Sequence, residues 1–224
     1  MHHPLPTNAL DDEANEALMK RYIHFQDESQ AAFKQHRKEL VKRVVNWRWA
    51  TDQMASPEPY YKKLFRGGRW RKDGKQTDND EGHGFDDQGR IVVIDAYHSL
   101  LFDYGDDFIE EGRFDHRKCA IYIRRYFYNG DGQLDRALTL RYNGGIETFY
   151  VWDGDRILRT SSRCWSAQDL LFKDETWSGK IRDQFIAENI YNYDEHGELD
   201  EILRVDPDNG GTIEVKYRRK KRGD

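Results

Sequence analysis

The sequence predicts an α+β protein in which N-terminal helices pack on a large antiparallel meander sheet, built of hairpin repeats of about 20 residues. Three observations lead to this fold class. Segments of alternating apolar and polar residues recur through the second half of the chain, and clusters of turn-forming residues lie between these segments. In the first fifty residues, the apolar side chains follow helical spacing. The expected regions are helices over 1–75, a connector over 76–84, hairpin repeats over 85–220 and a tail over 221–224.

Length and composition set the bounds of this prediction. The chain has 224 residues, of which 37% are hydrophobic, 34% charged and 13% aromatic. Aromatic side chains bury a large area each, so a few rings can support a thin core. The two cysteines, Cys119 and Cys164, show no metal or redox spacing, and a disulfide between them stays open. Without a signal peptide or an apolar run of about 18 residues, we expect a soluble cytoplasmic protein without membrane contact.

Residues 8–50 are expected to be helical. Acidic residues fill the first turns and apolar residues follow along roughly one face, until Ser56–Pro59 stops any helix. The simplest interpretation is that these helices cover the apolar face of the sheet. The alternative makes Trp47 and Trp49 part of a binding surface, although two residues at i and i+2 cannot share one helical face.

The clearest element is a hairpin near the C-terminus. Its arms, Leu199–Val205 and Thr212–Tyr217, alternate apolar and polar residues, and the turn formers of Asp206–Gly211 separate them. The preceding segment, Ile186–Tyr193, enters through an Asp- and Gly-containing turn and should fold back antiparallel.

One phrase recurs upstream of this hairpin: an aromatic residue, three residues, Gly, a polar residue and an apolar residue. Shortened copies follow Trp152 and Trp177. A repeat of this length holds two short strands and two turns. The full copies begin at Phe85, Phe108, Tyr128 and Tyr193, with glycines at Gly89, Gly112, Gly132 and Gly197.

The segment Tyr191–Tyr217 resembles the YD repeat of bacterial Rhs-type proteins, within a looser, partial match over about residues 85–217. It contains Tyr-Asp-x-x-Gly-x-Leu, then a Pro-Asp-x-Gly-Gly turn and Thr-x-x-x-x-Tyr. The region from Tyr128 to Trp152 is similar to the hairpin repeats of MORN-variant proteins. The resemblance implies a small hairpin sheet in a bacterial protein associated with polymorphic toxin systems. It implies no catalytic residues.

Further strands are expected between these turns. Ser166–Thr176 is expected to form a short helix or a longer loop, and Lys75–Gly84 a flexible connector. Neighbouring strands should pair in a meander. The expected strands are Arg90–Tyr97, Cys119–Tyr128, Leu134–Tyr142, Ile146–Trp152 and Arg156–Ser162.

The formal charge reverses between two adjacent segments. Residues 34–75 carry thirteen Lys or Arg against four Asp or Glu, a balance of +9, whereas 76–116 carry twelve acids against two Arg, a balance of −10. The two segments could lie together and neutralise each other. Alternatively, the acidic segment faces a basic partner, or the basic one faces nucleic acid. Arg66, Arg69, Trp70 and Arg71 mix guanidinium groups with an aromatic ring, as single-strand binders do.

Catalytic signatures are weak. The Asp-rich turns lack the Gly and Glu positions of a calcium loop, and no serine lies in a nucleophile elbow. A metal-dependent hydrolase with a site between His83 and Asp107 remains an alternative. Its candidate ligands are His83, Asp86, Asp87, Asp95 and His98.

The leading hypothesis is a non-enzymatic protein-binding protein without a cofactor. In its specific form it is an immunity protein that occludes a bacterial toxin domain. Acidic residues would then complement a basic cleft on the toxin, which mainly raises the association rate. The residues expected to make this contact are Asp103, Asp106, Asp107, Glu110 and Glu111.

Overall fold

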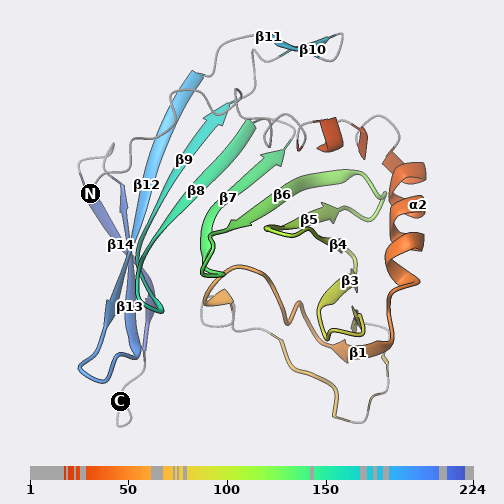
Figure 1. Ribbon diagram of the computed structural model, residues 1–224, viewed down its shortest axis with the longest axis horizontal. Helices are drawn as coiled ribbons and strands as arrows, with labels where there is room; N and C mark the ends of the chain where they lie inside the picture. Colours follow the sequence, from red (N-terminus) through yellow and green to blue (C-terminus); the bar gives the residue numbers. More distant parts are fainter. Residues whose placement is uncertain are drawn as a thin grey trace.

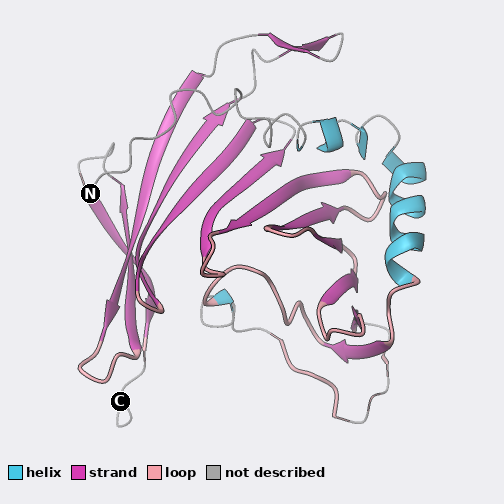
Figure 2. Cartoon of the chain, viewed as in Figure 1, coloured by secondary structure: helices cyan, strands magenta, loops and turns pink. Residues whose placement is uncertain are grey.

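The structure is a computed structural model of the whole chain. It describes residues 18, 20–22, 24–25, 29–61, 68–72, 74, 76–77, 80–141, 144–166, 171–173, 176–178, 182–206 and 211–219. One large antiparallel sheet dominates the described chain, and helix is confined to its N-terminal part (Figure 2).

The sheet has twelve strands in the order β1-β2-β3-β4-β5-β6-β7-β8-β9-β12-β13-β14, so nearly every strand pairs with its neighbour in sequence. The predicted antiparallel meander is confirmed. The exception is the hairpin β10–β11, which forms a separate two-stranded sheet. The strands are β1 (Asn46–Ala50), β2 (Glu81–Phe85), β3 (Ile91–Asp95), β4 (Ser99–Tyr104), β5 (Phe108–Phe114), β6 (Ala120–Tyr128), β7 (Leu134–Arg141), β8 (Gly144–Asp153), β9 (Arg156–Ser166), β10 (Leu171–Lys173), β11 (Thr176–Ser178), β12 (Arg182–Tyr193), β13 (Leu199–Asp206) and β14 (Thr212–Arg218).

The sheet curls at its N-terminal end. Strands β1 to β6 bend round with helix α2 (Ser29–Val41) beside them, whereas β12 to β14 lie at the opposite side of the molecule (Figure 1). Residues 18, 20–22 and 24–25 are also helical. The segment after β1 runs back toward the middle strands (Figure 1), where its residues 58 and 60 bond to β6 and β12.

The largest buried cluster joins the helical residues to the strands. Phe114 of β5 packs against two helical rings, with ring centroids 5.0 Å from Phe25 and 4.8 Å from Phe33. Aromatic pairs in such tilted arrangements add to the free energy gained by burial alone. The other buried members of the cluster are Leu18, Tyr22, Ala32, Leu40, Val92, Val93, Leu101, Ala120, Ile123, Leu138 and Leu140.

Three copies of the repeated phrase form the same turn. Asp86, Asn129 and Asp194 each accept two backbone N–H bonds through one side-chain oxygen, from residues two and four positions later. The glycine three positions after each has a positive φ, 73° at Gly89 and Gly132 and 78° at Gly197. Glycine is favoured there because it has no Cβ to clash. In each copy the aromatic residue lies at a β-bulge just before the turn.

The copy expected at Phe108 is wrong. Gly112 lies inside β5, where an added Cβ would lie 2.8 Å from the ring of Phe114. The corresponding turn instead follows Phe114, with Asp115 accepting the N–H of Cys119. Its fourth residue is Lys118, which adopts a φ of 67° without being glycine.

The helix expected over 8–50 is wrong at its end, because α2 stops at Val41 and Asn46–Ala50 form β1. In a strand, Trp47 and Trp49 do share one face, and their rings stack at 6.2 Å. They lie opposite Gly84 and Gly82 of β2, respectively. A Cβ at Gly82 would collide with the ring of Trp49, and one at Gly84 with the side chains of Val44 and Trp47. Glycine is therefore needed beneath the tryptophan rings.

Two of the predicted connections contain strands. The connector expected over 75–84 ends early, since Glu81–Phe85 form β2. The helix or loop expected over 166–176 contains β10 and part of β11. The remaining predicted strands match β3, β6 to β9 and β12 to β14 within a few residues. The expected tail over 221–224 lies outside the described residues.

Candidate functional site

Two of the five predicted acidic residues form an internal ion-pair cluster. Asp103 accepts a hydrogen bond from Arg21 Nη2 at 2.7 Å and lies 2.7 Å from His36 Nε2. The buried carboxylate of Glu110 bonds to Arg21 and, at 2.6 Å, to Arg125 Nη2. Arg21 and His36 belong to helical segments, so this cluster joins the helices to β4, β5 and β6.

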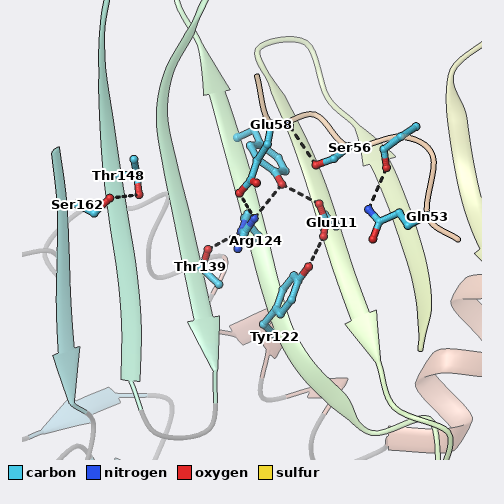
Figure 3. Close-up of polar contacts among 11 residues, drawn as sticks. Gln53, Ser56, Glu58, Glu111, Tyr122, Arg124, Thr139, Thr148 and Ser162 are labelled. Atoms are coloured by element: carbon cyan, nitrogen blue, oxygen red, sulfur yellow. Dashed lines mark hydrogen bonds and ion pairs between the residues drawn. The ribbon is translucent and has the colours of Figure 1, made fainter. Parts of the chain in front are cut away.

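Glu111 is buried as well, in a second polar network on β5 and β6 (Figure 3). Tyr126 donates to Glu111 Oε2 at 2.8 Å, and Tyr122 donates to the other carboxylate oxygen. Burial raises the pKa of both phenols, and the nearby Glu111 charge adds to this effect. Both hydroxyls therefore stay protonated and act as hydrogen-bond donors.

Arg124 extends this network to the segment that follows β1. Its guanidinium bonds to Glu58 and donates to Thr139 Oγ1 at 2.6 Å (Figure 3). The hydroxyl of Tyr60 lies 2.9 Å from that of Tyr193 on β12. These contacts hold the segment 51–61 against the sheet. Each polar group here already has a partner, which is typical of a structural network.

Only Asp106 and Asp107 of the predicted acidic set are exposed. They lie in the turn between β4 and β5, where Gly105 N–H donates to Phe108 O at 2.9 Å. The acidic surface expected from the sequence is therefore reduced to the tip of one hairpin.

Of the predicted basic loop, residues 66–72, the residues 69–71 lie along β1. Arg71 N–H donates to Trp49 O at 2.8 Å, and Thr51 N–H donates to Arg69 O at 3.1 Å. One side of Trp70 is occupied by the guanidinium of Arg48, 4.0 Å from the ring centroid. Because its ring is already covered there, Trp70 offers little area for stacking a base. Arg66 lies outside the described residues.

The basic and acidic segments neutralise each other at several points. Arg37 Nε donates to Asp95 at 2.9 Å, and Arg71 Nη2 donates to Asp80 at 2.7 Å. Arg43 lies 3.6 Å from the carboxylate of Asp86. Hydrogen bonds from Arg71 lower the pKa of Asp80 to about 2. These pairs support the interpretation that the two oppositely charged segments lie side by side.

Three of the candidate metal ligands each make separate contacts with other residues. His83 is buried, accepts Met54 N–H at Nε2 over 3.1 Å and donates from Nδ1 to Glu81 O over 3.2 Å. Burial lowers its pKa to about 4. Asp86 shapes a turn and Asp95 binds Arg37. Across the described part of the chain, no three His, Cys, Asp or Glu side chains gather as a metal site would require.

An apolar patch lies at the other end of the sheet, on β12 to β14. Ile190, Leu203 and Val215 are direct cross-strand neighbours, as are Val205 and Ile213 in the adjacent row. Cross-strand neighbours and residues at i and i+2 in a strand point to the same face. The side chains are unusually exposed, by 36% at Ile190, 63% at Ile213 and 46% at Val215. We name these five residues the C-terminal patch.

The two edges of the sheet differ. The outer side of β1 is covered by residues 69–71, through the bridge between Ala50 and Trp70. β14 is the last strand at the other edge, and no described strand pairs with its outer side. An exposed edge beside exposed apolar residues is a template for pairing with another chain.

Comparison with known proteins gives no family assignment. No protein-family model matches the chain, and no curated protein matches it significantly. In the described residues, no helix has the length and apolar character needed to span a membrane.

Sequence reasoning missed the C-terminal patch as a candidate site. The alternation in its strands predicts an apolar face, but it does not show whether other residues cover that face. The available signal was the position of β14, which is the edge strand of the described sheet.

Proposed function

We propose that this protein binds another protein through the C-terminal patch and the outer edge of β14, the edge strand of the described sheet. The observation that carries the proposal is the exposure of Ile190, Ile213 and Val215 next to an edge strand without a described neighbour. A partner that adds an extended strand to β14 would satisfy the outward backbone groups of the edge. Its side chains would cover the patch.

The specific role that we propose is that of an immunity protein, with a bacterial toxin domain as the partner. The YD-repeat resemblance of Tyr191–Tyr217 supports this role, because that stretch contains the paired strands β13 and β14. The two networks around Glu110 and Glu111 hold the sheet together by buried bonds, so it can present the patch without rearrangement.

The test compares two charge-introducing variants of the full chain. I213K/V215K places two lysines in the patch, whereas I121K places one at an exposed apolar position on β6. Both sites are exposed, so we expect the free energy of unfolding to change by less than about 0.5 kcal/mol. Tagged wild type should capture one stoichiometric partner from the native lysate, identified by mass spectrometry.

I213K/V215K should lose this partner, because a lysine in the buried centre of an interface is strongly unfavourable. I121K should retain it. Equal capture by I213K/V215K and wild type would show that the partner docks elsewhere.

A further inference from the structure

A pocket of about 670 Å³ lies between helix α2 and the β3–β4 hairpin, and Lys118 lines it. Volumes of this size are typical of small-molecule sites. The pocket is independent of the C-terminal patch, since its lining residues come from α2, the β2–β4 region and the turn that holds Lys118.

The backbone at Lys118 differs from that of the equivalent turns. The three other copies place Gly89, Gly132 and Gly197 at this position, all with positive φ. A lysine in this conformation is strained, because its Cβ approaches the backbone. A non-glycine residue in this conformation is a reason to look for what its side chain does.

The Lys118 side chain carries its charge to the pocket. Its ammonium donates to Ser99 Oγ at 2.9 Å and lies 5.1 Å from the centroid of the Phe33 ring. An ammonium has three N–H donors, so Ser99 leaves two for a ligand. In the described part of the chain, Lys118 has no carboxylate within ion-pair distance.

Apart from Glu81, the other charged groups that line the pocket are already in ion pairs. Arg37 binds Asp95 through two hydrogen bonds, and Asp80 is held by Arg71. The last acid, Glu81, is only partly ionised at neutral pH because burial raises its pKa to about 7. Lys118 is therefore the cation with spare capacity among the described lining residues.

We propose that this pocket binds a small monocarboxylic acid with an apolar body, its carboxylate on Lys118. The apolar body would lie near the Phe33 ring, Ala96 and Tyr97, which line the same space. Tyr97 is 69% exposed and stacks on His116 with ring centroids 5.2 Å apart, which fixes one wall.

A carboxylate fits better than a phosphate for two reasons. Phosphate sites use several donors, often a bidentate Arg, whereas here Arg37 is occupied by Asp95. A dianion would also be repelled more strongly by the neighbouring carboxylates of Asp80 and Asp95.

The competing explanation is that Lys118 only fastens α2 to the sheet, through Ser99 and Phe33. K118M and K118R separate the two roles, because both keep the strained backbone and a long side chain, and only K118R keeps the charge. The probes are acetate, isovalerate, benzoate, phenylacetate and inorganic phosphate, each titrated into the full chain and followed by calorimetry and NMR.

We expect wild type to bind benzoate or phenylacetate with a Kd of about 1 mM or tighter, and phosphate at least about tenfold more weakly. K118M should lose at least about tenfold in affinity, whereas K118R should stay within roughly threefold of wild type. The proposal is overturned if wild type binds none of the four carboxylates, if K118M binds them as well as wild type does, or if phosphate binds most tightly.

Discussion

Tyr126 donates its hydroxyl hydrogen to the buried carboxylate of Glu111 over 2.8 Å, and both residues lie among the least exposed of the protein. A buried carboxylate is tolerated only when hydrogen bonds replace its lost hydration. The neighbouring hydroxyl of Tyr122 and the guanidinium of Arg124 complete the same network. Its function is to hold β5 and β6 together and to fix the segment 51–61 across the sheet.

Removing the hydroxyl in Y126F should lower the free energy of unfolding by about 1–3 kcal/mol, because Glu111 loses a donor in a buried site. Urea denaturation measures the change. Y128F is the matched control, since the Tyr128 hydroxyl has no hydrogen-bond partner within the described chain and should contribute less than about 0.5 kcal/mol. Equal effects of the two substitutions would contradict a stabilising network.

The second prediction concerns pH. Burial raises the pKa of Glu81 to about 7 from 4.5, so the folded state holds a proton that the unfolded state releases, and stability falls as pH rises through this window. Burial lowers the pKa of His83 to about 4 from 6.5, so between these values the unfolded state binds more protons and stability rises with pH. The two effects oppose each other in wild type.

E81Q removes the first effect and leaves the second. Its unfolding free energy should increase with pH relative to wild type, by roughly 2–3 kcal/mol over the Glu81 window. Urea denaturation at several pH values from 4.5 to 7 tests this. Parallel pH curves for E81Q and wild type would show that the carboxyl of Glu81 titrates normally in the folded protein.

The third prediction uses two glycines of one turn. Gly132 has a φ of 73° and open space around its Cβ position, so G132A adds only backbone strain. This strain exceeds the stabilisation from the smaller conformational entropy of the unfolded chain, for a net loss of about 1 kcal/mol. Gly130 has equally open space without a positive φ, so G130A should be neutral or slightly stabilising. Thermal unfolding of both variants makes the comparison. A neutral G132A would show that the turn does not require the left-handed conformation.

The sequence predicted the meander well because strand alternation and turn chemistry are local. It did not predict β1 and β2, because the residues that make each of these strands fit depend on the partner strand. The sequence around Trp47 and Trp49 favours a helix when it is considered alone. In the structure these residues lie in a strand, opposite Gly84 and Gly82. The paired glycines leave room for the rings, and such complementarity is invisible to a window along one segment.

The site was predicted less well, because charge in the sequence does not reveal whether a carboxylate reaches the surface. Glu110 and Glu111 are adjacent, yet each is buried by a different network, one toward the helices and one toward the segment 51–61. Neighbouring residues in a strand face opposite sides of the sheet, so a run of acids cannot form one surface. The strained turn at Lys118 was missed because a lysine replaces the glycine that marks the repeat.

The last prediction compares the exposed residues Asp106 and Asp107 with Asp103, which is in an internal ion pair. D106K/D107K changes two exposed turn residues, so stability should change by less than about 0.5 kcal/mol. If the partner is basic, its association rate at low salt should fall severalfold and become less dependent on salt. Stopped-flow mixing with the captured partner measures both quantities.

D103K instead destroys the contacts of Asp103 with Arg21 and His36 and places a lysine beside the Arg21 guanidinium. It should destabilise the protein by about 1–3 kcal/mol, because those bonds join the helical segments to β4. Any loss of binding by D103K would then accompany a loss of folded protein, whereas a loss by D106K/D107K would not. An association rate unchanged by D106K/D107K at low salt would remove the acidic hairpin tip from the interface and leave the C-terminal patch to account for recognition.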